Sequence, residues 1–265
     1  MTSIDGMGTD RARCVLAPNA SPMTLDGTNT WILAEPGSSG VVVVDPGPED
    51  GGHQGGHLRR VAETVTARDR HVALVLLTHG HADHAEGAAT FAELAGPRVP
   101  VRALDPRHRL GDEGLAEGDV VAVDGLEVRV METPGHSGDS LSFWLPADQA
   151  ILTGDTVLGY GTTVLDGRLS DYLSSLDRLR AFAEETVART ILPGHGPKLD
   201  DPIAVLDHYI RHRKERLAQV EAAVAAGART AREVVERVYA DVDRSLWPAA
   251  EWSVQSQLDY LRERG

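Results

Sequence analysis

Side chains that bind metal ions crowd into one short stretch of the sequence. Residues 76–87 read LLTHGHADHAEG and contain, in order, His79, His81, Asp83 and His84. Three imidazoles so close together would repel one another on protonation, so they need a common partner. Neutral imidazole and carboxylate groups together suit zinc or another first-row divalent ion. The stretch therefore predicts a metal site.

Further acidic and histidine side chains follow other apolar runs of the chain. They are Asp45 after VVVV, His136 in TPGHSGD, Asp155 in ILTGDT and His195 in ILPGHGP. In sheet proteins with helices outside, sites are assembled from the loops at strand ends. Glycines beside the histidines let the backbone turn tightly and bring these side chains to a shared centre. Alone, His195 would more often be a surface residue; together with the 79–84 cluster it is a ligand candidate.

The elements that must position these residues alternate between strands and helices. Apolar, β-branched runs predict strands at 30–35, 41–45, 71–79, 99–104, 140–146, 149–155 and 190–195, and a hairpin at 119–136. Helical patterns cover residues 59–69, 84–96 and 169–185. The run at 71–79 is typical of a strand buried on both faces. This alternation predicts an α/β protein with a mixed sheet in each half.

The last part of the chain has helical patterns only. A long helix is expected at 204–227, and Thr230 with Glu233 forms a capping box for the next helix. We interpret residues 1–202 as the catalytic domain and residues 203–265 as a helical appendage docked through its first helix. The appendage is too short to bury much surface alone.

Charge and composition limit the partners of the protein. The net charge is −14 over 265 residues, and residues 203–265 hold 10 basic and 10 acidic residues, so the rest carries the whole negative charge. A chain that binds nucleic acid usually shows a basic face, and none is evident. No apolar stretch could span a bilayer and no apolar signal core is present, so we expect a cytoplasmic protein without a membrane partner. Cys14, among polar residues before the first expected strand, is interpreted as a bystander thiol.

The pattern H-x-H-x-D-H, followed by a lone His, a G-D and a final G-H, resembles the metallo-β-lactamase superfamily of hydrolases. The resemblance covers residues 18 to about 202 and implies an αβ/βα four-layer sandwich. It implies ligand roles, by position, for two metals: His79, His81 and His136 for the first, Asp83, His84 and His195 for the second, and Asp155 as the bridge. It also implies that Asp45 orients a ligand imidazole from behind.

A finer likeness lies in TLDGTNTW, GDTVLGYGTTV, SDYLSSL, PGHGP and HYIRHRKERLAQV. These segments resemble the β-lactamase-like protein 2 branch, whose best-known member is an endoribonuclease acting on single-stranded RNA. Fungal thioesterases that release polyketides from acyl-carrier proteins are similar in the same segments. The appendage resembles the winged-helix-like tail of the RNA-cleaving branch, but little chain is left to form a wing after LRERG.

The resemblance implies two Zn²⁺ ions, with Mn²⁺ or Fe²⁺ as alternatives, which share a bridging hydroxide of lowered pKa. Asp83 and Asp155 are the implied catalytic carboxylates: Asp83 accepts a hydrogen bond from the hydroxide and Asp155 bridges the ions. We expect a hydrolase of small esters or thioesters, which the acidity of the chain favours. The alternative is a metal-dependent endoribonuclease on single-stranded RNA, which the finer likeness favours. A mononuclear-iron persulfide dioxygenase is less favoured, although it shares the H-x-H-x-D-H cluster.

Candidates for substrate binding rest on weaker signals. They are Tyr160, Thr162 and Thr163 in GYGTTV, and Tyr209 and Arg213, one turn apart on the long helix. A glycine turn with strand-favouring threonines explains GYGTTV equally well. The basic run RHRKER at 211–216 could bind an anionic substrate, but a solvated helix face is its commoner meaning. His53 and His57, in a glycine-rich loop, are interpreted as part of a lid, and Trp31 as a packing residue.

Overall fold

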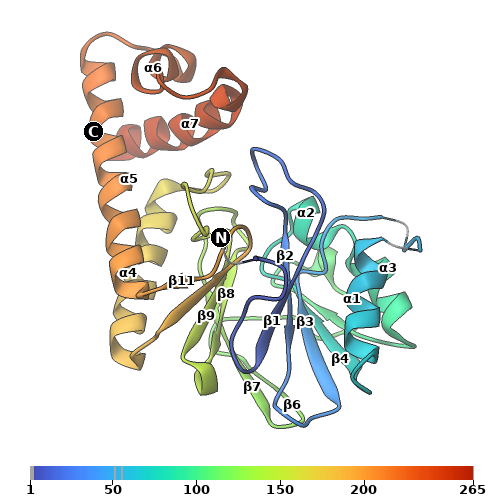
Figure 1. Ribbon diagram of the computed structural model, residues 1–265. Coiled ribbons are helices and arrows are strands. Elements are labelled where there is room, and N and C mark those ends of the chain that lie inside the picture. Colours follow the sequence, from blue (N-terminus) through green and yellow to red (C-terminus); the bar gives the residue numbers. More distant parts are fainter. Residues whose placement is uncertain (1–2, 51, 55, 265) are drawn as a thin grey trace.

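The structure, a computed structural model, describes residues 3–50, 52–54 and 56–264. Two β-sheets lie face to face, and helices cover their outer faces (Figure 1). The five-stranded sheet contains, in spatial order, β1 (Ala12–Leu16), β2 (Asn29–Leu33), β3 (Gly40–Val44), β4 (His71–Leu76) and β5 (Val101–Arg102). The six-stranded sheet contains, in spatial order, β11 (Leu199–Asp200), β10 (Thr190–Pro193), β9 (Ala150–Gly154), β8 (Leu141–Leu145), β7 (Leu126–Glu132) and β6 (Val120–Val123). This layering confirms the predicted αβ/βα sandwich.

The first half of the fold is organised around the parallel pair β3 and β4, which α1 (His57–Thr66) connects. Along β3, Val42 and Val44 contact the core between the sheets, while Val41 and Val43 contact the core under the helices. A strand covered on both faces reads as an unbroken apolar run, because alternate side chains point to opposite faces. Since parallel strands end at the same edge, the polar residues after β3 and β4 meet there.

The second half repeats this arrangement with the parallel pair β9 and β10, connected by α4 (Leu169–Thr186). Asp155 follows β9 and His195 lies two residues beyond β10, so both belong to one edge of the second sheet. The predicted hairpin is present as β6 and β7, and Asp124 and Gly125 form its turn. The two sheets therefore bring polar strand ends to the same side of the sandwich.

The helix expected at 84–96 is divided into α2 (Ala82–Ala85) and α3 (Ala88–Ala95). The division falls at Gly87, whose amide donates to the Gly47 carbonyl at 3.0 Å. A Cβ at Gly87 would lie 2.8 Å from the Pro48 carbonyl oxygen and 2.9 Å from that of Gly47. Only glycine permits this close approach, which fixes α2 against the turn that follows β3.

Strand β1 was not predicted, and this changes the interpretation of Cys14. The residue lies inside β1, opposite Trp31 of β2, and is 1% exposed. Its thiol contacts the Asn29 side-chain oxygen at 3.4 Å. The expectation of a thiol among polar residues was therefore wrong. Burial raises the pKa of the Cys14 thiol, which agrees with an unreactive side chain.

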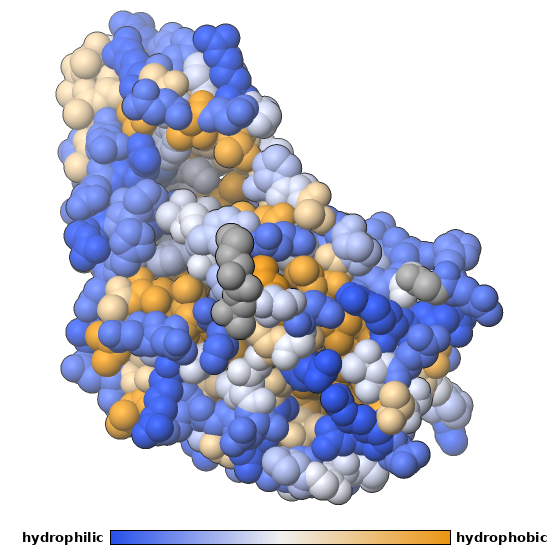
Figure 2. Space-filling model, in the orientation of Figure 1, coloured by the Kyte–Doolittle hydropathy of each residue, from blue (hydrophilic) through white to orange (hydrophobic). Residues whose placement is uncertain are grey.

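The C-terminal helices are α5 (Pro202–Ala225), α6 (Ala231–Val238) and α7 (Trp247–Arg264). The first part of α5 shares a core with α4, whereas its last part forms a separate small core with α6 and α7. Thr230 caps α6 as predicted, accepting from the Glu233 amide at 3.2 Å. Figure 2 shows the surface hollowed between these helices and the two-sheet body. The domain boundary after residue 202 stays a prediction.

Among the helices that the structure describes, none combines the length and apolar character needed to cross a bilayer. The cytoplasmic location stays a prediction.

Candidate metal centre

Three histidines from two separate loops converge on one point. The His79 Nε2 and His136 Nε2 atoms lie 3.1 and 2.9 Å from His81 Nδ1. His79 and His81 precede α2, while His136 comes from the loop between β7 and β8. Nitrogen atoms at these separations can ligate one ion. We call these residues the three-histidine group.

A second set of ligand atoms lies beside the first. His84 Nε2 is 3.2 Å from His195 Nε2, and Asp83 Oδ2 is 3.1 Å from His195 Nε2 and 3.5 Å from His84 Nε2. Asp83 and His84 are on α2, and His195 follows β10, so this set joins the two sheets. We call Asp83, His84 and His195 the carboxylate group.

Asp155 lies between the two groups and is 8% exposed. Its Oδ1 atom is 3.4 Å from His84 Nε2, and its Oδ2 atom is 3.3 Å from His195 Nε2 and 3.7 Å from His136 Nε2. Within the described residues, Oδ1 has no hydrogen-bond partner. The seven side chains predicted as ligands therefore lie together, with one carboxylate in reach of both groups.

The hydrogen bonds behind the carboxylate group determine which ring nitrogens carry protons. His84 Nδ1 lies 2.8 Å from the Asp45 carboxylate, and His195 Nδ1 lies 3.0 Å from the Gly27 carbonyl oxygen. Both acceptors require an N–H on Nδ1, so in neutral rings both Nε2 atoms present lone pairs. Two such lone pairs face each other across 3.2 Å.

The three-histidine group follows the same rule. His136 Nδ1 lies 2.8 Å from the Val164 carbonyl oxygen, which requires an N–H on that atom. The Thr78 hydroxyl donates to Asp45 at 2.6 Å, so it accepts from His79 Nδ1 at 3.0 Å. The Nε2 atoms of both histidines are thus left unprotonated, and they point at His81 Nδ1.

Converging lone pairs and carboxylates require a positive charge at their centre. Burial lowers the pKa of His84, but Asp155, Asp83 and Asp45 raise it well above its ordinary value. Burial likewise opposes protonation of His195, but Asp155 and Asp83 raise its pKa to about 9. Burial raises the pKa of Asp83, but His84 and His195 lower it to about 2. The donor set fits divalent cations.

Asp45 lies where the sequence predicted a supporting carboxylate. It is 1% exposed and has a left-handed backbone with a φ of 51°. Besides His84, it accepts from the Thr78 amide at 2.8 Å and from the Thr78 hydroxyl. One buried carboxylate therefore connects the end of β3 to histidines of both groups, directly to His84 and through Thr78 to His79.

Several supporting residues were not identified from the sequence. Asn29 donates to the carbonyl oxygens of Pro193 and Gly196 at 2.9 and 2.8 Å, which fixes the loop that carries His195. Trp31 is 2% exposed, which confirms its packing role, and its Nε1 also donates to Pro193. The TLDGTNTW likeness contained both residues, but the sequence gave no role to Asn29 and only a packing role to Trp31. The signal available in the sequence was an asparagine at the start of an apolar strand.

Not all of the substrate-binding candidates are accessible. Tyr160 is 50% exposed, and its hydroxyl donates to Asp26 at 2.9 Å. Thr162 is partly buried. Thr163 is buried, with its hydroxyl 2.8 Å from His136 Nδ1. Tyr209 and Arg213 are also buried, so the expectation that these two contact substrate is corrected: both are covered by the segment that follows β9.

The basic run 211–216 is not a uniformly solvated helix face. Arg213 is 5% exposed, and Arg216 is partly buried with its guanidinium over the Tyr239 ring. Arg211 and Lys214 are exposed. The interpretation as a solvated face was therefore wrong for Arg213, because α5 presents this residue to α4 and the body of the fold.

His57 is a structural residue. It begins α1, is 3% exposed, and lies 2.8 Å from the Thr30 hydroxyl through Nε2. Burial lowers its pKa to about 4. The lid interpretation was wrong for His57, while His53 is exposed, and Gly51 and Gly55 of the same segment lie outside the described residues.

A third group of possible ligands, Asp105, His108 and Asp139, lies near Gly80. All three side chains are partly exposed. Arg107 already donates to Asp105 from its amide and its guanidinium, which supplies a positive charge from within the chain. A metal ion is not needed to balance this group.

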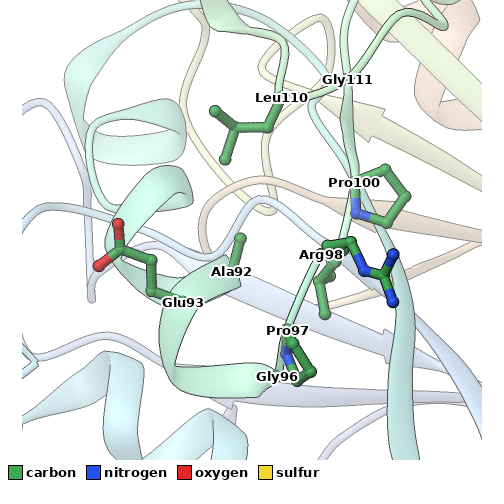
Figure 3. Close-up of a pocket in the computed structure, with 9 residues that line it drawn as sticks. Ala92, Glu93, Gly96, Pro97, Arg98, Pro100, Leu110 and Gly111 are labelled. Carbon is green, nitrogen blue, oxygen red and sulfur yellow. The ribbon is translucent and has the colours of Figure 1, made fainter.

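A surface cavity of about 530 Å³ lies between the end of α3 and β5 (Figure 3). Its lining residues are Ala92, Glu93, Gly96, Pro97, Arg98, Val99, Pro100, Leu110 and Gly111. None of the predicted ligands or substrate-binding candidates is among them. We therefore place the reaction at the metal centre and not in this cavity.

Comparisons with known proteins agree with this geometry. Residues 23–195 match the Metallo-beta-lactamase superfamily, and residues 230–265 match the Beta-lactamase associated winged helix domain. A "Beta-lactamase-like protein 2 homolog" of Caenorhabditis elegans is 32% identical over 266 residues, 97% of this chain and 86% of the relative. An "Atrochrysone carboxyl ACP thioesterase" of Aspergillus fumigatus is 31% identical over 243 residues, 85% of this chain and 72% of the relative.

A solved structure supports the fold assignment. The crystal structure of a metallo-beta-lactamase family protein from Thermus thermophilus superposes with a TM-score of 0.77 and 22% identity, covering 96% of this chain and 94% of that chain. The sandwich, the His/Asp metal-binding cluster and the match over residues 23–195 agree. The chain belongs to the metallo-beta-lactamase superfamily and is a metal-dependent hydrolase.

Proposed function

We propose that the protein uses two divalent ions, most readily Zn²⁺, to hydrolyse small esters or thioesters. The observation that carries the two-ion proposal is the position of Asp155, whose carboxylate oxygens lie 3.3–3.7 Å from histidines of both groups. His79, His81 and His136 would hold one ion, and Asp83, His84 and His195 the other. One four-coordinate ion could not use seven ligands.

When bound, two such ions supply an activated water and polarise the bond to be cleaved. Asp155 keeps its charge at the centre, because His195 and His84 lower its pKa well below the ordinary value against the effect of burial. Asp83, with a pKa of about 2, is an acceptor that can orient the attacking water. Its side chain is 28% exposed, so a substrate can reach it from solvent.

The charge distribution supports an ester or thioester substrate. The net charge is −14, and the basic run on α5 offers no continuous cationic path, since Arg213 is buried. Tyr160 is the candidate best suited to contact a substrate: it is half exposed, and its ring lies beside Gly196, next to His195. A relative that aligns over 85% of this chain is named a thioesterase.

Single-stranded RNA is the second candidate substrate. The likeness to the β-lactamase-like protein 2 branch and the winged-helix match at residues 230–265 favour it. Exposed Arg211 and Lys214 are the cations of the basic run that are free to meet a phosphate backbone. A persulfide dioxygenase with one iron is the third candidate, and the presence of two ligand groups argues against it.

Metal content tests the two-ion proposal. Protein purified without added metal and then saturated with Zn²⁺ should hold two ions per chain by elemental analysis. A reproducible value of one, unchanged by further Zn²⁺, would refute the dinuclear proposal and favour the one-iron candidate.

A substrate panel tests the reaction. We expect turnover of uncharged thioesters and esters, and no cleavage of single-stranded RNA or phosphodiesters. Arg211→Gln with Lys214→Gln should leave thioester turnover intact. RNA cleavage by the parent protein that weakens in this double variant, with a shallower salt dependence, would establish the second candidate instead.

A further inference from the structure

We propose that helix α5 positions His136 of the three-histidine group, with Tyr209 and Arg213 acting through residues 156–166. Both side chains are thus positioning residues and not substrate contacts. The inference rests on the proposed ligand role of His136 and adds to it a structural origin for the placement of that ligand.

The segment after β9 holds His136 by both its side chain and its backbone. The Thr163 hydroxyl and the Val164 carbonyl oxygen each lie 2.8 Å from His136 Nδ1. The Asp166 amide donates to the His136 carbonyl oxygen at 2.8 Å. A displacement of residues 163–166 would therefore rotate or shift the ligand.

This segment has no strand or helix of its own to fix it. Its amide and carbonyl groups are satisfied in part by side chains of α5. The Tyr209 hydroxyl accepts from the Leu158 amide at 2.9 Å and lies 3.2 Å from the carbonyl oxygens of Leu158 and Gly161. Arg213 donates to the Thr163 carbonyl oxygen. The two side chains thus hold the segment at its beginning and at the residue that contacts His136.

Arg213 is an unusual residue for this task, because it is a cation with 5% exposure. Its guanidinium lies over the Tyr172 ring, 5.0 Å from the centroid. Among the described residues it forms no ion pair, and its Nε has no hydrogen-bond partner. Burying an unpaired charge is costly, and an apolar side chain of similar size is often neutral or stabilising in such a place. Stability alone does not explain this residue, whereas fixing the Thr163 carbonyl does.

Tyr172 of α4 completes the support. Its hydroxyl donates to the Thr156 carbonyl oxygen at 2.7 Å, and its ring is fully buried beneath Arg213. Helix α7 contacts the far end of the same stretch: the Ser253 hydroxyl accepts from the Leu165 amide at 3.3 Å, and Ser256 donates to Gly167 at 2.9 Å. The C-terminal helices therefore brace the loop that carries the supports of His136.

The same helix supplies a matched control. Arg216 also lies over a tyrosine ring, with 4.4 Å to the centroid of Tyr239, and also donates to a backbone carbonyl, that of Val238 at 3.1 Å. Its contacts, however, are within the small core of α5, α6 and α7. The two arginines share chemistry and helix but differ in what they hold.

The decisive comparison is Arg213→Met against Arg216→Met. Each full-length variant is purified metal-free and titrated with Zn²⁺ against a chromophoric chelator. We expect Arg213→Met to bind one of its two ions about 10–100-fold more weakly, the range for a residue behind a ligand, and the other ion as the parent does. Arg216→Met should bind both ions as the parent does. Equal behaviour of Arg213→Met and the parent would overturn the inference.

A second variant guards against misfolding of Arg213→Met. Tyr209→Phe keeps the buried ring and removes only the hydroxyl between Leu158 and Gly161. It should weaken the same ion by roughly 3–10-fold, as for one lost hydrogen bond. Co²⁺ in place of Zn²⁺ should show a changed visible spectrum for that ion alone. The metal-free Tyr209→Phe protein should keep the far-ultraviolet circular dichroism spectrum of the parent, which excludes misfolding, although the unpaired Leu158 amide should lower its melting temperature. Unchanged affinity and spectrum would count against the inference.

The parent protein separates this inference from the proposed function. A parent that binds one ion or none refutes the two-ion proposal itself. A parent that binds two ions, with variants identical to it, refutes only the positioning role of α5. Arg213→Lys adds a rescue test: it keeps a charge near Thr163 and should recover part of the affinity that Arg213→Met loses.

Discussion

The two ligand groups of the metal centre are held in different ways. In the carboxylate group, His84 and His195 are fully buried, and their outer nitrogens meet Asp45 at the end of β3 and Gly27 just before β2. In the three-histidine group, the side chain of His81 is 36% exposed, and His136 depends on the loop before α4. The carboxylate group is thus fixed by strand ends. In the three-histidine group, Asp45 also holds His79 through Thr78, whereas His136 is held by a loop and by helices from the end of the chain.

This difference separates two ways of building one site. Strand ends are held by continuous backbone pairing and by cores on both faces, so ligands attached to them need few further contacts. A loop has no such pairing and needs side chains from elsewhere, here Tyr209 and Arg213 of α5. The comparison predicts that changes behind each group act on that group, while changes between them act on both.

Asp155→Asn should have the largest effect, because its carboxylate lies between the groups. The amide keeps the shape but removes the charge that balances two cations. We expect activity to fall by more than the roughly 10–100-fold typical of a supporting residue, and both ions to bind more weakly. Metal titration with activity assays measures this. The exposed Asp177→Asn is the control, and loss of a single ion in Asp155→Asn would contradict the shared role.

Asp45→Asn tests the support of the carboxylate group. Asparagine tolerates the left-handed backbone at this position, so the substitution changes charge and leaves the turn intact. We expect a loss of about 10–100-fold in metal affinity or activity, chiefly for the ion of His84. Asp69→Asn, at an exposed left-handed aspartate, should have no effect. Weakening of the other ion alone would break the comparison.

The clustering of the seven candidate ligands was predictable from sequence, because each follows an apolar run or lies in a short motif. Asp45, His79 and Asp155 needed only the rule that polar residues after strands meet at one sheet edge. The other groups behind the ligands followed no such rule. Gly27 and Val164 act through backbone carbonyls, which leave no trace in residue type.

The remaining differences arise from contacts distant in sequence. The sequence of residues 211–216 shows that the run is basic. It does not show that α4 and the loop at 156–166 cover Arg213. His57 follows glycines typical of a loop, and the residue before its helix, Gly56, has no side chain that could cap it. The break at Gly87 depends on its contact with Gly47, some forty residues earlier. Local patterns predicted most of the elements, although not β1, and the burial of individual side chains required the assembled fold.

The buried imidazole of His57 makes the stability of the fold at acidic pH depend on the part of the site that contains Asp45. Its folded pKa of about 4 lies below its ordinary value of 6.5, so unfolding binds a proton as the pH falls. The contribution of neutral His57 to stability is fully present above pH 6.5. Protonation of this residue should lower the free energy of unfolding by about 2 kcal/mol between pH 7 and pH 5. Denaturant unfolding of metal-free parent and His57→Gln at both pH values measures the difference.

A chain of hydrogen bonds connects His57 to the turn at Asp45: His57 donates to the Thr30 hydroxyl, which donates to the Asp45 carbonyl oxygen at 2.7 Å. Only neutral His57 avoids a buried charge next to this turn. His57→Gln should therefore lose less stability on acidification than the parent. Equal losses in the two proteins would mean that other groups cause the acid sensitivity.

The smallest expected effect concerns a strained residue outside both groups. Val187 ends α4 in the left-handed conformation, with a φ of 54°, and is 64% exposed. A β-branched side chain in the left-handed conformation destabilises the fold by roughly 1–2 kcal/mol. Glycine removes this strain, but part of the gain is lost because glycine raises the conformational entropy of the unfolded chain. Val187→Gly should therefore stabilise the protein by about 0.5–1 kcal/mol. Val120→Gly, at a 57% exposed position of strand β6, should destabilise it.

The contrast with Asp45 makes this small effect informative. Both residues are left-handed, but Asp45 contacts His84 and Thr78, whereas Val187 caps a helix at the surface. Strain at a site is retained when it places a functional group, and strain elsewhere can be relieved without loss. Val187→Gly should thus raise the melting temperature and leave the affinity for both ions unchanged. Weaker binding of either ion would show that the end of α4 also positions ligands, and that the two groups are less separately supported than their contacts indicate.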